Sequence, residues 1–306
     1  MRWHDEIPTA VLLVLTYGAF AGLGLAIGWI PLPLIILGLS IIIAQHSSLQ
    51  HEVLHGHPFP YQTINDALVF PALGLFIPYM RFKDTHLAHH HDPNLTDPYD
   101  DPETNFLDAA DWRRMSGWQQ QLFGFNNTLI GRMLVGPALS LAAFYRTDLG
   151  KIRAGDGRVL LAYGLHIGGM SIAIGFLSGV AGLPIWAYVS AAYLGMSWLK
   201  IRTFLEHQAH DRAAARSVII EDRGPLALLF LNNNYHAVHH AHPQIVWHKL
   251  PKVFAQKRDL FLRRNGGYSY KSYGQIFGQY ALRQKDPVAH PFWSRENRTM
   301  DHDLTK

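Results

Sequence analysis

Cysteine is absent from the 306 residues of this chain. The absence excludes disulfides, thiolate zinc sites, cysteine-bound iron–sulfur clusters and a cysteine nucleophile. Charged residues are also scarce, because they make up 16% of the sequence against about 25% in an average soluble domain. The formal net charge of +4 is modest, and the sequence contains no RNA- or DNA-binding motif. A nucleic-acid partner is therefore not expected.

Long apolar runs account for the scarcity of charge. A helix crosses a bilayer with about 20 apolar residues, and four runs approach or exceed this length: Thr9–Ile30, Pro31–Gln50, Val159–Val180 and Leu183–Ile201. The first run has no signal-peptide cleavage pattern and is followed at once by the second, as expected of a membrane anchor. Its small-xxx-small pairs predict close contact with another helix, and they are formed by Gly18, Gly22, Gly24 and Gly28.

Two shorter apolar segments are poor candidates for crossing the membrane. Ala67–Met80 is interrupted by Pro71 and Pro78, and Leu129–Tyr145 contains Arg132. A charge at the middle of a bilayer costs several kcal/mol. We expect both segments to lie at the membrane interface.

The basic residues predict the orientation. One group precedes the third long run and another follows the fourth: Arg146, Lys151, Arg153 and Arg158, then Lys200, Arg202 and Arg212. The positive-inside rule places both groups in the cytosol. With four spans, both termini and all long polar segments then lie on the cytosolic side.

These features predict an all-α integral membrane protein with four transmembrane helices, interfacial helices and a cytosolic helical cap. We expect a single domain over residues 1–306. Its predicted parts are a first helical hairpin at about 9–50, a cytosolic or interfacial part at 51–158, a second hairpin at 159–201 and the cap at 202–306.

Histidine is abundant, with 19 residues, and three groups repeat one spacing. The first group has an i, i+4 pair and the other two have i, i+3, i+4 trios: His51 and His55; His86, His89 and His90; His236, His239 and His240. Residues three and four apart share a helix face, and imidazole is the commonest metal ligand. A single pair of histidines at this spacing more often belongs to the protein surface or the core than to a metal site. The threefold repetition instead indicates a metal site, and eight histidines exceed the four ligands of one tetrahedral ion.

The second group has an alternative register. His86, His90 and His91 would also form a metal-binding pattern. His86, His89 and His90 share one helical face, whereas His91 lies about 100° away from it. The sequence favours His89 over His91.

HEVLH (His51–His55), HLAHH (His86–His90) and HAVHH (His236–His240) resemble the three histidine boxes of integral-membrane fatty acid desaturases and related hydroxylases. Their order, and the membrane-spanning interval between the second and third boxes, are similar too. The resemblance covers about residues 40–250, and NNNYHAVHHAHP (Asn232–Pro243) is most similar to bacterial fatty acid desaturases.

The resemblance implies a di-iron centre with histidine ligands, O₂ as co-substrate, an alkyl-chain substrate and electrons from an external donor. The implied ligands are the eight histidines of the boxes and one more from EHQAHD. His207 is favoured over His210 because Leu199–His207 can continue the fourth span as a helix. Some family members carry an asparagine one turn earlier, where this chain has Thr203.

Other polar residues admit two interpretations each. Glu52 and Glu206 precede implied ligands and could accept an imidazole N–H or be solvated. The acidic run Asp97–Glu103 could bind metal or form a polar loop. A group in the tail could hold the phosphate of a lipid or of an acyl carrier, or form a solvated basic face: Arg258, Arg263 and Arg264.

The favoured function is an acyl-lipid desaturase in the bacterial inner membrane, with its active site on the cytosolic side. A hydroxylase or ketolase of the same architecture, acting on an alkyl chain or a carotenoid, is the first alternative. A membrane metal transporter or sensor is the second, although transporters bind ions near the bilayer midplane. No haem, flavin or ferredoxin motif is found in the sequence. The electron donor should therefore be a separate protein, such as a ferredoxin or cytochrome b5.

Overall fold

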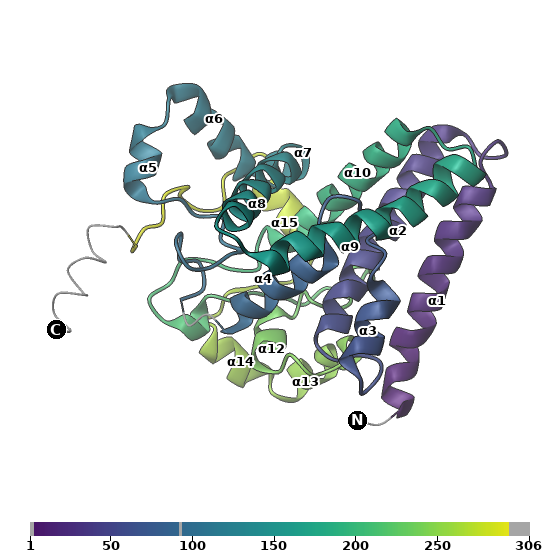
Figure 1. Cartoon of the computed structure of the whole chain (residues 1–306). Coiled ribbons are helices and arrows are strands. Elements are labelled where there is room, and N and C mark those ends of the chain that lie inside the picture. Colours follow the sequence, from purple (N-terminus) through teal and green to yellow (C-terminus); the bar gives the residue numbers. More distant parts are fainter. Residues whose placement is uncertain (1–2, 92–93, 294–306) are drawn as a thin grey trace.

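The computed structural model describes residues 3–91 and 94–293, and the fold is mostly helical, as predicted (Figure 1). Three helices are long and apolar enough to cross a membrane: α1 (Trp3–Leu25), α2 (Leu32–Leu54) and α9 (Gly157–Ile174) with its π-helical extension to Val180. The fourth predicted span forms α10 (Ile185–Thr203). Its apolar character is lower because tryptophan, tyrosine and serine, as well as Lys200 and Arg202, interrupt it. The crossing of the membrane by α10 stays a prediction.

Shorter helices make up the rest of the chain. Before α9 these are α3 (Gln62–Val69), α4 (Tyr79–His91), α5 (Ala109–Arg114), α6 (Gly117–Asn126), α7 (Leu129–Leu134) and α8 (Gly136–Arg153). After α10 they are α11 (Pro225–Leu229), α12 (His236–Ala241), α13 (Leu250–Gln256), α14 (Arg258–Arg264) and α15 (Tyr273–Tyr280). Two short parallel strands, β1 (Ile219–Ile220) and β2 (Ser269–Tyr270), join the segment after α10 to the tail.

The two predicted interfacial segments are not single helices. Ala67–Met80 contains the end of α3, an irregular stretch and the start of α4. The irregular stretch is consistent with Pro71 and Pro78, because proline disrupts the backbone hydrogen bonds of a helix. Leu129–Tyr145 is divided between α7 and α8.

Helix α2 lies between α1 and α10 and packs against both. The core between them contains Phe20, Leu39 and Tyr188. A close approach of α10 and α2 occurs at Gly195 of α10, where a Cβ atom would lie 2.7 Å from Cγ2 of Ile43. A glycine there lets the two helix backbones meet.

The helix contact predicted from four glycines of the first apolar run is wrong at three positions. Gly18, Gly22 and Gly28 have no atom within 4 Å of the place where a Cβ would be. Gly24 does pack closely, against Phe176 and Leu177. Of the four glycines in the small-residue pattern, Gly24 alone makes a close contact.

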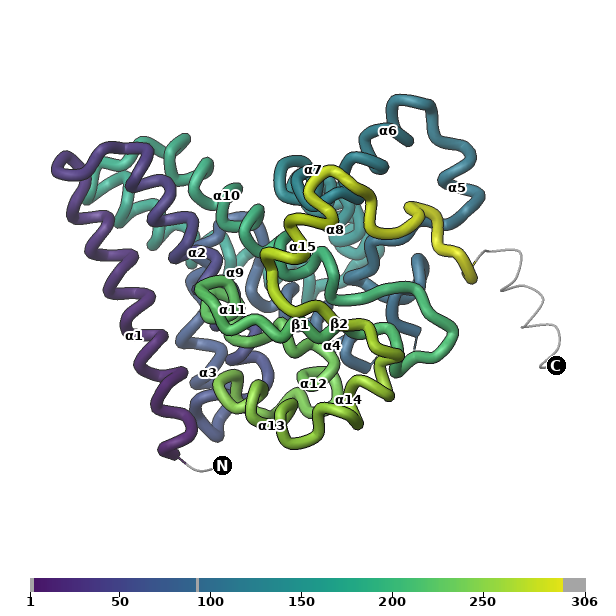
Figure 2. Tube along the Cα trace, turned by 180° about the vertical axis from the view of Figure 1, so that it is seen from behind, coloured from purple at the N-terminus to yellow at the C-terminus, as the bar shows by residue number. Residues whose placement is uncertain are grey.

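The histidine-bearing helices meet at one end of α2. Helix α4 packs against α2 and α9, and the buried Arg81 of α4 forms two hydrogen bonds to Asp148 of α8, of 3.0 and 2.8 Å. Helices α12, α13 and α14 lie below α4 in both views (Figures 1 and 2). The end of α2, the C-terminal part of α4 and helix α12 therefore surround one region.

Candidate metal centre

The first histidine group combines residues from three helices. It contains His51 from the last turn of α2, His55 directly after that helix, His86 and His90 from α4, and His239 from α12. One nitrogen of each ring lies within 4.8 Å of the corresponding nitrogens of the others. These imidazoles come from places far apart in the chain, so the fold itself assembles the group.

The second group lies beside the first. It contains His89 from α4, His207 from the segment after α10, and His236 and His240 from α12. The Nε2 atom of His207 is 3.0 Å from that of His89 and 3.0 Å from that of His236. The rings of His90 and His240, one from each group, stack with centroids 4.2 Å apart. The two groups therefore adjoin.

The structure thus brings together all nine histidines singled out in the sequence. The i, i+3, i+4 spacing explains the division into two groups. On α4, His86 and His90 face the first group and His89 faces the second; on α12, His239 faces the first group. The remaining α12 residues, His236 and His240, face the second.

The predicted path to His207 is wrong, although His207 does reach the site. Helix α10 ends at Thr203, and His207 lies in an extended segment that pairs antiparallel with Ser217. The backbone N–H of Gln208 donates to the carbonyl of Arg216 at 2.9 Å, which holds this segment away from a helical path. His210 belongs to neither group, and its Nδ1 accepts a hydrogen bond from the Arg212 backbone at 3.0 Å.

His89 and His91 have different surroundings. His89 is buried in the second group, whereas His91 is exposed and its Nδ1 donates to the carbonyl of Leu87 at 2.5 Å. Replacement of His89 with alanine should abolish activity, and replacement of His91 should leave most of it. Turnover and bound metal of the two purified variants, compared side by side, test this expectation. The reverse order would show that His91 is the ligand.

Two carboxylates orient imidazoles on α4. The Nδ1 of His89 donates to Asp101 at 2.7 Å, and the Nδ1 of His86 donates to Glu103 at 3.0 Å. A neutral imidazole that has its proton on Nδ1 presents the lone pair of Nε2. Such carboxylate–imidazole pairs fix the ring and make the other nitrogen a better ligand. Both carboxylates come from the acidic run, for which the sequence left a metal-binding role and a polar loop open.

Two further acidic residues have different surroundings. Glu206 forms an ion pair with Arg202 at 2.9 Å and accepts a hydrogen bond from Asn233 at 3.2 Å. The side-chain oxygen of Asn233 in turn lies 3.2 Å from Nδ1 of His236. Glu206 therefore supports the second group through Asn233. Glu52 accepts from the backbone of Trp247 at 3.1 Å and lies 3.9 Å from Nε2 of His57, which belongs to neither group.

Four of the imidazoles are in the chemical state that a metal requires. His89 differs, because burial lowers its pKa but Glu103 and Asp101 together raise it to about 9. Burial, and then the proximity of the other imidazoles, holds four pKa values well below the ordinary value of histidine: those of His207, His236, His239 and His240. These rings are neutral at pH 7 and keep a lone pair. Lone pairs that face one another at about 3 Å repel unless a cation or proton lies between them.

The donor set therefore fits metal ions. His51 gives a second indication, because its Nε2 is buried and has no hydrogen-bond partner among the described residues. Imidazole ligands suit iron, zinc, copper and nickel, and nine of them in two adjoining groups suit two ions.

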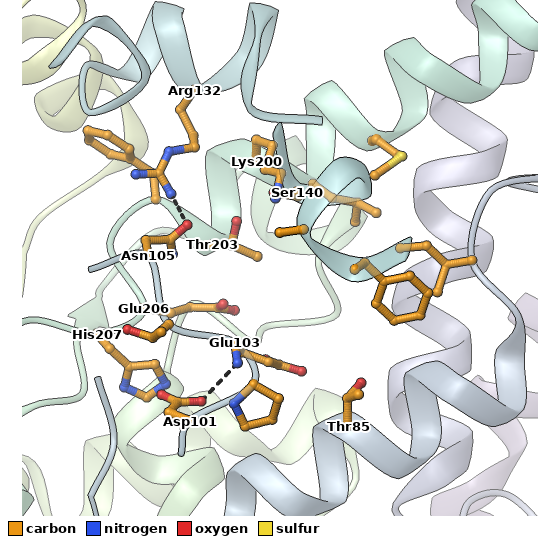
Figure 3. A pocket seen from close by; sticks show the side chains of 18 of the residues that line it. Thr85, Asp101, Glu103, Asn105, Arg132, Ser140, Lys200, Thr203, Glu206 and His207 are labelled. Atoms are coloured by element: carbon orange, nitrogen blue, oxygen red, sulfur yellow. Dashed lines mark hydrogen bonds between the residues drawn. The ribbon is translucent and has the colours of Figure 1, made fainter. Parts of the chain in front are cut away.

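A cavity of about 410 Å³ adjoins the second group. His207, Glu103 and Glu206 line it near the histidines, and Arg132 and Lys200 line another part (Figure 3). Apolar side chains also form its wall, among them Phe76, Phe144, Met196 and Leu199. Thr203 lies in the wall as well, and its buried hydroxyl has no hydrogen-bond partner in residues 3–91 and 94–293.

Comparison with known families gave one finding. The model of the fatty acid desaturase family matches residues 27–272, which is most of the chain and includes all nine histidines. A search of curated proteins gave no match.

Proposed function

This chain belongs to the fatty acid desaturase family and is an oxidoreductase, and from that premise we propose that it is an O₂-dependent acyl-lipid desaturase. Nine histidines would hold two iron ions: His51, His55, His86, His90 and His239 for one, and His89, His207, His236 and His240 for the other. The convergence of these imidazoles in two adjoining groups beside a cavity is the observation that carries the proposal.

The proposed reaction is the four-electron reduction of O₂ to water, in which the alkyl chain and the external donor each supply two electrons. Two hydrogens leave adjacent carbons of the alkyl chain, and O₂, two external electrons and two protons complete the formation of a double bond and two waters. Bound iron would supply the activation of O₂, which zinc does not provide. Asp101 and Glu103 keep the rings of His89 and His86 oriented, and the apolar wall of the cavity excludes water from the alkyl segment.

The membrane arrangement is part of the proposal. Three apolar helices support an integral membrane protein. We infer a multi-pass topology in which α10 also crosses and the histidines lie on the cytosolic side, because basic residues flank α9 and α10 there. A separate electron-transfer protein, such as a ferredoxin or cytochrome b5, would deliver the electrons.

A lipid profile tests the reaction type. Lipids of a host that expresses the wild type are compared by mass spectrometry with those of a host that expresses His239→Ala. We expect acyl chains that have lost two hydrogens with the wild type alone. Gain of one oxygen would instead identify a hydroxylase or ketolase. Wild-type protein that binds iron and receives electrons, but oxidises none of the host lipids after reconstitution with them, would contradict an enzyme acting on these lipids.

A further inference from the structure

The charges around the cavity are unevenly compensated. Five carboxylates line it, and each is already engaged: Asp101 with His89, Glu103 with His86, Asp148 with Arg81, Glu206 with Arg202, and Asp286 with Lys285. Three cations in the wall have no carboxylate within 4.0 Å among the described residues: Arg132, Lys151 and Lys200. Lys151 is exposed to solvent, whereas Arg132 is 3% exposed and Lys200 is partly buried.

Lys200 and Arg132 form hydrogen bonds to uncharged acceptors. Lys200 donates to the hydroxyl of Ser140 at 2.7 Å. Arg132 donates to the carbonyl of Asn126 at 2.9 Å and to the side-chain oxygens of Asn105 and Asn127. These bonds position the two side chains but do not neutralise them. Burial lowers the pKa of Arg132 to about 10, which reflects how poorly the charge is solvated.

The two cations lie in one part of the cavity. Arg132 is on α7 and Lys200 is on α10, and these helices pack against each other. Both side chains are seen on the same side of the cavity, with Glu206 and His207 on the other side (Figure 3). Burying two like charges with no carboxylate in direct contact is unfavourable. An anion bound between them would remove this cost.

We propose that Arg132 and Lys200 bind the anionic head of the substrate, a carboxylate or a phosphate. The alkyl segment next to that head then lies along the apolar wall and reaches the histidines. This inference rests on the proposed function, since it identifies the substrate class of the same site.

The basic residues of the tail lie apart from this cavity. Arg258 of α14 is paired with Glu221 at 2.7 Å, and none of Arg258, Arg263 and Arg264 lines the cavity. An anion held by these arginines would therefore lie outside the cavity. The cavity has its own cations, which come from α7 and α10.

Binding of short amphiphiles to the iron-loaded protein in neutral phosphatidylcholine nanodiscs tests the proposal. The probes are octanoate, octyl phosphate and octanol, measured by equilibrium dialysis without electron donor or O₂. We expect at least one anion to bind at least about tenfold more tightly than octanol. Lys200→Gln should remove this preference while octanol affinity and iron content stay unchanged. Lys151→Gln is the matched control, and it should keep the preference.

Each outcome has a defined meaning. A preference for octanoate alone indicates a free fatty acid, a preference for octyl phosphate alone indicates a phosphate head, and a preference for both indicates recognition by charge. Equal binding of all three probes overturns the proposal, as does a preference that survives in Lys200→Gln. If Lys200→Gln loses iron, Lys200→Arg replaces it, and retention of the preference by that variant supports a role of the charge. Because binding is measured without turnover, the result does not depend on whether the enzyme desaturates.

Discussion

Replacement of His239 with alanine is expected to abolish desaturation and to lower bound iron, while the protein stays in the membrane. His239 is buried, and its Nε2 lies 3.1 Å from that of His90. Its ring centroid is 4.7 Å from those of His51 and His55. The substitution therefore removes one imidazole from the middle of the first group. Helix α12 lies outside the three apolar helices, so insertion should not depend on it.

Three measurements on the same preparation check this result: turnover, iron per chain and the membrane-bound fraction. Turnover should fall at least about a thousandfold, which corresponds to about 4 kcal/mol of lost transition-state stabilisation. His242→Ala is the matched control, because His242 is exposed, follows α12 directly and belongs to neither group. Wild-type turnover in His239→Ala, or full activity of iron-free protein, would refute the metal assignment.

The second large effect is expected from Asp101→Asn. Asp101 is buried, and its Oδ1 accepts hydrogen bonds from Nδ1 of His89 and from the backbone of Glu103. Its Oδ2 accepts from the backbone of Thr96. An amide is neutral and has one acceptor oxygen instead of two. The variant therefore loses part of this network and holds the His89 ring less firmly. Loss of a carboxylate behind a metal-bound imidazole typically costs 10- to 100-fold in metal affinity or activity.

Competition with a chelator measures the affinity of Asp101→Asn for iron. Asp211→Asn is a suitable comparison, because Asp211 is exposed and is in neither histidine group. Its iron affinity should stay within about twofold of the wild type, as is usual for exposed substitutions. An unchanged affinity in Asp101→Asn would show that the carboxylate supports the loop without tuning His89.

The histidine groups could be predicted because their signal is local. The i, i+3, i+4 spacing fixes which side chains share a helix face, and it holds for α4 and α12. The supporting groups could not be predicted in the same way. Asp101 and Glu103 follow the second box by a loop whose path depends on tertiary contacts, so no spacing relates them to His89 and His86. The extended path to His207 likewise depends on pairing with Ser217.

The packing of the apolar helices could not be predicted from local sequence either. Apolar length identified the helices, but it did not identify the surfaces that meet. Gly18 and Gly22 matched the small-residue pattern and face open space, whereas Gly195 makes the close approach between α10 and α2. The division of the chain into two hairpins and two cytosolic parts, and a fourth crossing by α10, stay predictions.

Helices α4 and α12 each contribute histidines to both groups. An ion held by either group would order both helices and so reduce the conformational entropy that the other group must lose to close around its own ion. Through this shared ordering, binding of an ion in one group would favour binding in the other. Where this effect exceeds the repulsion between the two cations, the singly loaded form would be scarce at half saturation.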